Sequence, residues 1–188
     1  EVKLNTEVTA QYIERVAPHA VVLATGASPS LPQVPGIRNG NVVTAQDVLA
    51  GKGKVGKRVV IIGGQRLACE TAEHLAAKRK AVTILGKQRP IGQEVIPEYG
   101  RNLMLERLRQ AGVTMVEHAE VASIGKAGVR VRKDGSSKLY PADTVVIAAG
   151  SAPDNKLAQE LADGSRRAYQ VGDCVTPRGF AEAIEEGF

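Results

Sequence analysis

Hydrophobic residues are concentrated in several short, nearly continuous runs that end at glycine or at polar residues. The clearest runs are Ala20–Gly26, Arg58–Gly64, Ala81–Leu85 and Asp143–Gly150. Uninterrupted apolar runs of this length are typical of strands that are covered on both faces of a parallel sheet. We therefore predict strands at these positions, and for Ala20–Gly26 a strand that is fully buried.

Between these runs the apolar spacing changes to that of amphipathic helices. Residues 65–78 carry small or apolar residues on one side, which allows close contact with a sheet: Ala68, Ala72, Leu75 and Ala76. Residues 97–111 predict a second helix that ends at Gly112. Its buried face carries Met104, Leu108 and Ala111. Shorter helices are expected near residues 11–16, after Thr44 as a cap, and near residues 158–163.

Other segments predict further strands. Residues 1–8 alternate with a period of two, and the stretches 113–125 and 128–142 have the same character, with a turn at Asp134–Gly135. Residues 168–174 predict a last strand. A final helix is expected beyond it, with Thr176 as its cap and Pro177 at its first position. Taken in order, residues 57–150 read as β-α-β-α followed by a β-rich return, after a flexible hinge at Gly51–Lys57.

Composition narrows the choice of partner and compartment. The net charge of +5 is spread along the chain without a run of five cations, which is typical of a solvated surface and not of a nucleic-acid footprint. No segment approaches the roughly 18 apolar residues of a membrane span. Cys69 and Cys174 are the only cysteines, so we expect packing thiols and a cytoplasmic setting. A start at Glu1 and a stop within a predicted helix lead us to expect a fragment of a longer protein.

The turn after residues 58–62 carries the main functional signal. Glycines at a strand-to-helix turn let the backbone approach a diphosphate, and the unpaired amides at the helix start can bind it. Against the pattern G-x-G-x-x-G/A, Gly63 fills the first position and Ala68 the third, and Gly64 precedes the helix. Gln65 stands at the second position, where its side chain either fills the diphosphate space or turns outward.

The end of the next strand bears on the choice of cofactor. An acidic residue there would accept hydrogen bonds from the ribose hydroxyls of NAD. The chain has Gly86 instead, followed by the cations Lys87 and Arg89, an arrangement that favours NADP(H) slightly over NAD(H). The alternative is that both cations are ordinary surface residues of a loop.

Three stretches together resemble one family. "VVLATGASPSLPQVPGI" is similar to the Ala-Thr-Gly segment of two-dinucleotide flavoprotein reductases, "RVVIIGGQRLACETAEHLA" to their NAD(P)-binding turn, and "YQVGDCVTPRGFAEAIEEGF" to their Gly-Asp segment. Their order and spacing most resemble the C-terminal region of NADH:flavin oxidoreductases of the 2,4-dienoyl-CoA reductase, 2-enoate reductase and trimethylamine dehydrogenase group, which are pyridine nucleotide-disulphide oxidoreductase-like.

The resemblance implies an α/β architecture in which a Rossmann-like, three-layer (ββα) NAD(P)-binding domain is inserted in a partial FAD-binding domain. Residues 52–150 would be the inserted domain, and residues 1–51 and 151–188 two pieces of the FAD domain. It also implies roles for individual residues. Asp173 would hold the ribityl chain of FAD, Glu70 would lie near the nicotinamide, and the remaining cofactor-binding positions would be Thr25, Gly26, Gly150 and Gly172.

The same resemblance implies that the full-length protein passes hydride from NAD(P)H to FAD, with FMN and an Fe–S cluster upstream. The isolated chain is expected to be inactive, because the family's first FAD-binding turn, Fe–S cysteine cluster and FMN barrel have no counterpart in it. No catalytic side chains and no metal ligands are expected, since the cofactors of such a redox protein carry the chemistry. The alternative is a degenerate nucleotide fold that packs on the flavin domain without binding NAD(P)H. Expected partners are the rest of the parent chain and a nucleotide, without nucleic acid or membrane, and a homo-oligomer is left open.

Overall fold

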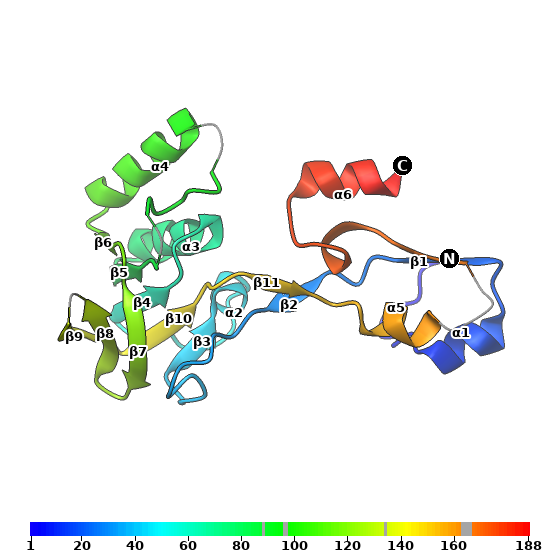
Figure 1. Cartoon of the computed structure of the whole chain (residues 1–188), viewed down its shortest axis with the longest axis horizontal. Coiled ribbons are helices and arrows are strands. Elements are labelled where there is room, and N and C mark those ends of the chain that lie inside the picture. Colours follow the sequence, from blue (N-terminus) through cyan, green and yellow to red (C-terminus); the bar gives the residue numbers. More distant parts are fainter. Residues whose placement is uncertain (88, 96–97, 134, 163–166) are drawn as a thin grey trace. The chain divides into compact units, whose positions relative to one another are not determined.

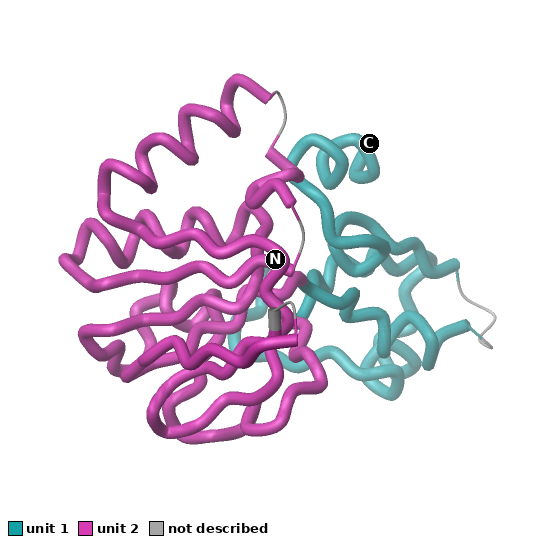
Figure 2. The backbone as a smooth tube through the Cα atoms, turned by 60° about the vertical axis from the view of Figure 1, so that its left-hand side comes forward, with its two compact units in different colours: residues 1–28, 151–188 teal, residues 29–150 magenta. Residues whose placement is uncertain are grey.

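The structure is a computed structural model that describes residues 1–87, 89–95, 98–133, 135–162 and 167–188. The chain divides into two compact units, coloured separately in Figure 2. Unit 1 consists of residues 1–28 and 151–188, and unit 2 of residues 29–150.

Unit 2 is built on a five-stranded parallel sheet with the order β3-β10-β4-β5-β6. The strands are β3 (Val42–Thr44), β4 (Arg58–Ile62), β5 (Ala81–Leu85), β6 (Thr114–Val116) and β10 (Thr144–Ile147). The central strand β4 has alternating side chains on the two faces, and both faces are buried. Val59 and Ile61 point to one hydrophobic cluster, whereas Val60 and Ile62 point to another. This double burial explains why the sequence of β4 is a continuous apolar run.

Three helices cover one face of this sheet: α2 (Ala45–Leu49), α3 (Arg66–Ala77) and α4 (Glu98–Gln110). Figure 1 shows α3 and α4 beside strands β4 to β6. Ala68 and Ala72 of α3 are fully buried, so the helix backbone lies close to the sheet. Leu75 of α3 and Leu108 of α4 complete this cluster with exposed fractions of 1% and 0%.

An antiparallel sheet covers the other face. It consists of β7 (Glu120–Gly125), β8 (Gly128–Lys133) and β9 (Ser136–Pro141), with β8 in the middle. Val129 and Val131 of β8 are buried together with Ile147 of β10. The expected α/β fold with a Rossmann-like three-layer unit is thereby confirmed: helices, parallel sheet and antiparallel sheet form the layers.

Unit 1 contains short elements around one parallel pair of strands. Its elements are α1 (Ala10–Val16), β1 (Ala20–Leu23), β11 (Ser151–Pro153), α5 (Lys156–Leu161), β12 (Arg167–Gln170), the 3₁₀ turn η1 (Gly172–Cys174) and α6 (Phe180–Gly187). β1 pairs with β12 in parallel, with Leu23 opposite Gln170. β2 (Ala27–Pro29) pairs with β11 at the point where the chain passes between the units.

Three sequence predictions in unit 1 are wrong. Residues 1–8 form no strand, and Val2 and Leu4 are 84% and 81% exposed, because alternation alone does not supply a partner strand. The run at Ala20–Gly26 forms β1, but Val22 is 66% exposed because β1 has only β12 beside it in the described part of the chain. The last helix begins at Phe180 with Gly179 as its cap, not at Pro177.

The physical reason for the late start of α6 lies in the preceding residues. The backbone amide of Arg178 donates to the Asp173 carboxylate (3.0 Å), which holds this segment outside a helix. Glu182 then accepts a hydrogen bond from the Gly179 amide (3.1 Å) and caps the helix there. The turn expected at 134–135 lies partly outside the described residues, as does the first residue of the helix expected at 97–111.

The predicted domain boundary at 51/52 stays a prediction, because a compact unit need not coincide with a domain. Residues 29–51 belong to the compact unit 2, because β3 pairs with β10 (Val43 opposite Val146) and Ala45 and Val48 of α2 are buried in its core. The predicted cap of α2 is confirmed, since Thr44 Oγ1 accepts from the Asp47 amide at 3.1 Å. Of the helices that the structure describes, none has the length and apolar character needed to span a lipid bilayer.

Candidate functional site

The candidate site lies at the carboxyl end of β4, where Gly63 is held between two neighbouring strands. Its amide donates to the Leu85 carbonyl (3.0 Å), and the Ala148 amide donates to the Ile62 carbonyl (2.8 Å). Gly63 has φ +140°, and a Cβ at this position would lie 2.1 Å from the Ala148 carbonyl oxygen. Only glycine fits both the conformation and the space. The first position of the dinucleotide pattern therefore has a structural basis.

Gly64 brings the turn close to the end of β5. A Cβ on Gly64 would be 3.0 Å from the Cα of Gly86, so the two backbones are nearly in contact. Gly86 is itself buried, and a Cβ there would lie 2.9 Å from Cγ1 of Ile91. The position at which the pattern expects an acidic ribose ligand thus has no room for a side chain while Ile91 occupies this place.

Helix α3 starts directly after this turn, with Gln65 as its N-cap residue. The first bond within the helix runs from the Cys69 amide to the Gln65 carbonyl (3.2 Å), so the preceding amides have no acceptor inside the helix. These amides and the positive end of the helix dipole form the kind of site that binds a phosphate oxygen. Ala68, the third position of the pattern, is fully buried against the sheet.

Residues 89–95, which we call the strap, cross the turn. The Gly92 amide donates to the Gly64 carbonyl at 2.6 Å. The Glu94 amide donates to Oε1 of Gln65 at 3.4 Å, so this side chain is directed at the strap. No motif in the sequence predicts the strap. Its only trace there is that Gln65 and Gly86, which lie next to it, depart from the dinucleotide pattern.

Glu117, just after β6, holds the other side of the strap. Its Oε1 accepts from the Ile91 amide at 3.3 Å, and its Oε2 lies 3.3 Å from Nε of Arg89. A cleft of about 650 Å³ adjoins these residues and is also lined by Leu105 and Arg109 of α4. Sequence reasoning did not identify Glu117 or Ile91, because neither belongs to a recognisable motif.

The other nucleotide residues predicted for unit 2 lie on its surface. Glu70 is exposed on α3, and Lys87 is exposed after β5. Arg89 is also exposed but is paired with Glu117. Gly150 has φ +99°, and its carbonyl accepts from the Ser30 amide at 3.0 Å. The structure therefore brings Gly63, Gly64, Gln65 and Ala68 together, and leaves the roles of the other four as predictions.

Cys69 follows Ala68 on α3 and is fully buried. Burial raises the pKa of its thiol to about 12, and the carboxylates of Glu70 and Glu73 act in the same direction. Because the thiolate is the reactive form, this cysteine is not a nucleophile at neutral pH. The expected packing role of Cys69 and of Cys174, which is 1% exposed, is confirmed.

The residues predicted for the flavin gather in unit 1, at the carboxyl ends of β1 and β12. Thr25 Oγ1 donates to the Asp154 carbonyl, and the Asp154 amide donates to the Gly26 carbonyl at 2.9 Å. Cys174 Sγ contacts the Leu23 carbonyl at 3.2 Å, which ties the Gly-Asp segment to β1. Ligands of open α/β sheets bind at this edge of parallel strands.

Gly172 and Asp173 already have partners within unit 1. The Gly172 amide donates to Oε2 of Glu186 (2.7 Å), and the same carboxylate contacts Arg178. Asp173 Oδ1 accepts from the Arg178 amide, while a carboxylate has a second oxygen that can accept from a ribityl hydroxyl. Asp173 thus fits its predicted role, whereas the amide of Gly172 bonds to a protein carboxylate.

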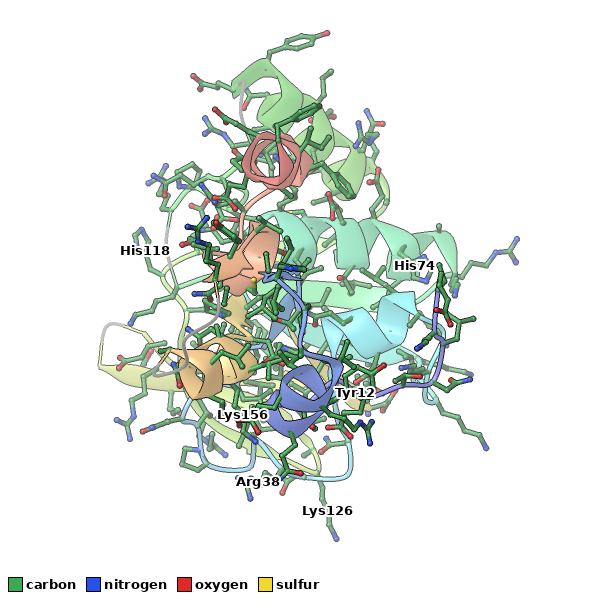
Figure 3. All side chains as sticks on the ribbon, turned by 90° about the vertical axis from the view of Figure 1, so that its right-hand side faces the viewer. Tyr12, Arg38, His74, His118, Lys126 and Lys156 are labelled. Carbon is green, nitrogen blue, oxygen red and sulfur yellow. The ribbon has the colours of Figure 1, made fainter. Side chains whose placement is uncertain are left out.

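Among the residues that the structure describes, no group of three or more His, Cys, Asp or Glu side chains is placed to hold a metal ion. Figure 3 shows the labelled His74 and His118 well apart. His74 belongs to α3, and His118 follows β6.

Known proteins are similar to this chain in sequence and in fold. A NADH oxidase of Thermoanaerobacter brockii is 34% identical over 100% of this chain and 30% of its own length. A metal reductase of Desulforamulus reducens is 32% identical over 89% of this chain and 29% of its own length. The solved structure of a 2-naphthoyl-CoA reductase in complex with 2-naphthoyl-CoA is 34% identical, with a TM-score of 0.92 over 98% of this chain and 28% of that one.

The chain therefore spans about 30% of the length of these relatives. The sequence profile described as pyridine nucleotide-disulphide oxidoreductase matches residues 1–173. The resemblance inferred from the Ala-Thr-Gly segment, the glycine turn and the Gly-Asp segment is thereby confirmed. With its glycine turn, its three-layer fold and this match over most of its length, the chain belongs to the pyridine nucleotide-disulphide oxidoreductase family.

Proposed function

We propose that this chain is the nucleotide-binding part of a flavin-dependent oxidoreductase that passes hydride from NAD(P)H to FAD in the full-length protein. FAD and NAD(P) are the cofactors of the family to which the chain belongs. In such enzymes the cofactors carry the chemistry, and the protein binds and orients them. NAD(P)H supplies the hydride, and FAD accepts it.

The observation that carries the proposal is the geometry at Gly63. Its φ of +140° and the 2.1 Å between an added Cβ and the Ala148 carbonyl oxygen exclude a side chain at Gly63. Gly64 has none either, so the turn carries no side chain before Gln65. The backbone amides of residues 66–68 would bind the diphosphate oxygens of NAD(P)H, because no carbonyl inside helix α3 accepts from them. Ala68 would let the helix lie close to the bound diphosphate and to the sheet.

Other residues have supporting roles in the proposal. Glu70 would lie near the nicotinamide, and Lys87 and Arg89 would favour a 2′-phosphate. In unit 1 Asp173 would accept a hydrogen bond from the ribityl chain, and Thr25 would line the same flavin site. We also propose that the rest of the protein carries FMN and an Fe–S cluster. The electrons would then pass to an acceptor of a kind that the relatives reduce.

A second candidate function is a nucleotide-type fold that does not bind NAD(P)H and packs on a flavin domain. The observation in its favour is Ile91, which is 1% exposed and occupies the space above Gly86. Gln65, whose side chain bonds to the Glu94 amide, points in the same direction.

Titration calorimetry with NADH and NADPH separates the two candidates. The proposed function predicts saturable binding that weakens about tenfold in Arg66→Glu, because a negative charge at the start of α3 repels the diphosphate. Lys78→Glu makes the same change in charge at the far end of α3 and is expected to leave the affinity unaltered. No heat at millimolar nucleotide, or equal losses in both variants, would remove the first candidate for this chain.

A further inference from the structure

We propose that Glu117, which follows β6, is the carboxylate that accepts hydrogen bonds from the adenosine ribose and selects NADH over NADPH. This inference rests on the proposed function and deepens it, because it assigns the choice of nucleotide at the same site to one residue. The dinucleotide pattern gives this task to an acidic side chain at the end of the second strand, where this chain has Gly86.

The first argument is that position 86 has no room for an acidic side chain while Ile91 lies beside it. A Cβ added to Gly86 would be 2.9 Å from Cγ1 of Ile91 and 3.5 Å from the Cα of Gly64. Ile91 is 1% exposed and belongs to the core cluster that also contains Met104. An acceptor for the ribose therefore has to come from a neighbouring segment.

The second argument is the position of Glu117 relative to Gly86. The Gly86 amide donates to the Val116 carbonyl (2.8 Å), and the Ala119 amide donates to the Gly86 carbonyl (2.9 Å). Both backbone groups of Gly86 are therefore bonded to the residues that flank Glu117 and His118. His118 has φ +55°, so the chain turns there. The Glu117 side chain thus starts from the backbone next to Gly86, one strand away from the place that the pattern gives to the acid.

The third argument is that this carboxylate is held in place and can still accept further hydrogen bonds. Its Oε1 accepts from the Ile91 amide at 3.3 Å, and its Oε2 lies 3.3 Å from Nε of Arg89. A carboxylate has about four lone-pair sites, so both oxygens can also accept from hydroxyl groups. The Glu117 side chain is 34% exposed, so a ligand can reach it. Because its orientation is fixed before binding, a ribose would bind with little loss of side-chain entropy.

The charges around Glu117 decide between the two nucleotides. Arg89 by itself would favour the 2′-phosphate of NADPH, but its guanidinium is paired with Glu117. A 2′-phosphate would be repelled by the Glu117 carboxylate and would compete with it for Arg89, whereas the 2′-hydroxyl of NADH can donate to the carboxylate. Because like charges at close range oppose binding, the wild type is expected to bind NADH at least about tenfold more tightly than NADPH. This preference is opposite to the one that Lys87 and Arg89 alone predict.

The test is titration calorimetry of Glu117→Gln with NADH and with NADPH. Glutamine keeps the length of the side chain and an acceptor for the Ile91 amide, but it removes the charge. We expect the Kd for NADH to rise about tenfold, because a hydrogen bond to a charged acceptor is lost. The Kd for NADPH should fall about tenfold, because the repulsion is removed and Arg89 is released.

Glu73→Gln is the matched control. Glu73 is a carboxylate of α3 that is likewise paired with an arginine, since its Oε1 lies 2.6 Å from Nε of Arg107. The substitution removes the same charge from unit 2 and breaks a comparable ion pair. It is expected to leave the Kd for NADH and the Kd for NADPH unchanged.

A nucleotide without the hydroxyl reports on the contact itself. NADH that lacks the adenosine 2′-hydroxyl should bind to the wild type about tenfold more weakly than NADH. Glu117→Gln should bind both nucleotides with nearly equal affinity. The double variant Glu117→Gln/Arg89→Gln should lose the gain in affinity for NADPH and keep the loss in affinity for NADH. These two results separate the hydroxyl contact from the release of Arg89.

The outcomes separate this inference from the proposed function. If Glu117→Gln changes the two Kd values by the same factor, or changes neither, Glu117 only supports the strap; the inference is then wrong, and the proposed function stands. The inference is also wrong, and the proposed function again stands, if the wild type binds NADPH as tightly as NADH. If neither nucleotide binds to any of the proteins, the proposed function fails and the assignment of Glu117 fails with it.

Discussion

The two units differ in how completely they bury their own hydrophobic residues. In unit 2, strands β4 and β10 are covered on both faces, and Ile61, Ile84 and Val145 are fully buried. In unit 1, Ile13, Leu23 and Cys174 are the buried hydrophobic residues of its described part, and the apolar side of α6 is exposed at Phe180, Ile184 and Phe188. Burial of apolar surface is the main source of stability, so we expect unit 2 to be the stable part of the chain.

Both units nevertheless carry a family motif at the carboxyl end of parallel strands. The glycine turn of unit 2 is supported by Leu85 and Ala148 from the neighbouring strands. The Gly-Asp segment of unit 1 is held by local bonds to Arg178 and Glu186 and by one contact to β1. A motif can therefore be recognised from sequence although the unit that contains it has almost no core of its own.

The largest expected difference between the units concerns a core substitution. Ile84→Ala removes a fully buried side chain from the centre of unit 2 and should lower the free energy of unfolding by about 4 kcal/mol. Val22→Ala in β1 of unit 1, where the side chain is 66% exposed, should change it by less than about 0.5 kcal/mol. Urea unfolding followed by circular dichroism measures both, and similar losses would contradict the contrast.

The glycine turn gives the next largest effect. Gly63→Ala places a Cβ 2.1 Å from the Ala148 carbonyl oxygen at a φ of +140°, and should cost about 3 kcal/mol in the same measurement. Gly40→Ala serves as control, since nothing lies within 4 Å of its added Cβ, and should stay within about 0.5 kcal/mol. A neutral Gly63→Ala would show that the close approach to Ala148 is not as described.

The two cysteines report on the two units separately. Cys69 is buried in the core of unit 2, and Cys174 is buried in unit 1. In the variants Cys174→Ala and Cys69→Ala, which keep one thiol each, a thiol reagent at pH 8 should label Cys174 at least about tenfold faster than Cys69, because unit 1 opens more readily. Mass spectrometry follows both reactions. Equal rates, or faster labelling of Cys69, would mean that the two units open together.

The smallest expected effect is a pH dependence at the base of the unit 2 sheet. Hydrogen bonds from the side chain and backbone of Arg58 lower the pKa of Asp143 to about 2. The pKa of an unfolded aspartate is about 3.9, so this stabilisation is complete above about pH 4 and is lost as the pH falls towards about 2. Thermal unfolding of the wild type should therefore lose its advantage over Asp143→Asn in this window. A constant difference between the two down to pH 2 would argue against the depressed pKa.

The sequence predicted the elements whose pattern is local. The strand predicted at Arg58–Gly64 and the helix predicted at 65–78 agree closely with β4 and α3, because double burial and a small-residue face leave clear patterns in the sequence. The fully buried strand predicted at Ala20–Gly26 was wrong, because burial depends on neighbouring elements that a strand's own residues do not specify. The helix start at Phe180 was missed because it depends on a contact between residues five positions apart. The Asp173 carboxylate accepts a hydrogen bond from the Arg178 amide, which keeps residues 174–178 out of the helix.

The candidate site was predicted in part for the same reason. Gly63, Gly64 and Ala68 follow a pattern that reflects backbone geometry, which sequence displays directly. The position of the strap depends on contacts between segments that are distant in sequence, such as Ile91 with Glu117. No spacing pattern in the sequence predicts such contacts. Gln65 and Gly86 depart from the dinucleotide pattern. In the structure, the Gln65 side chain accepts a hydrogen bond from the Glu94 amide of the strap, and Ile91 of the strap lies 2.9 Å from a Cβ added to Gly86.

Amide NMR during a titration with NADH tests the central claim most directly. If the turn after β4 is the diphosphate site, the largest chemical-shift changes should be at the amides of Gly64, Gln65 and Arg66, and the amides of the Gly-Asp segment, residues 172–173, should not move. Saturation should be approached by about 1 mM nucleotide, the upper end of usual affinities. Absence of change at the start of α3 at that concentration, or changes confined to residues elsewhere, would contradict the account.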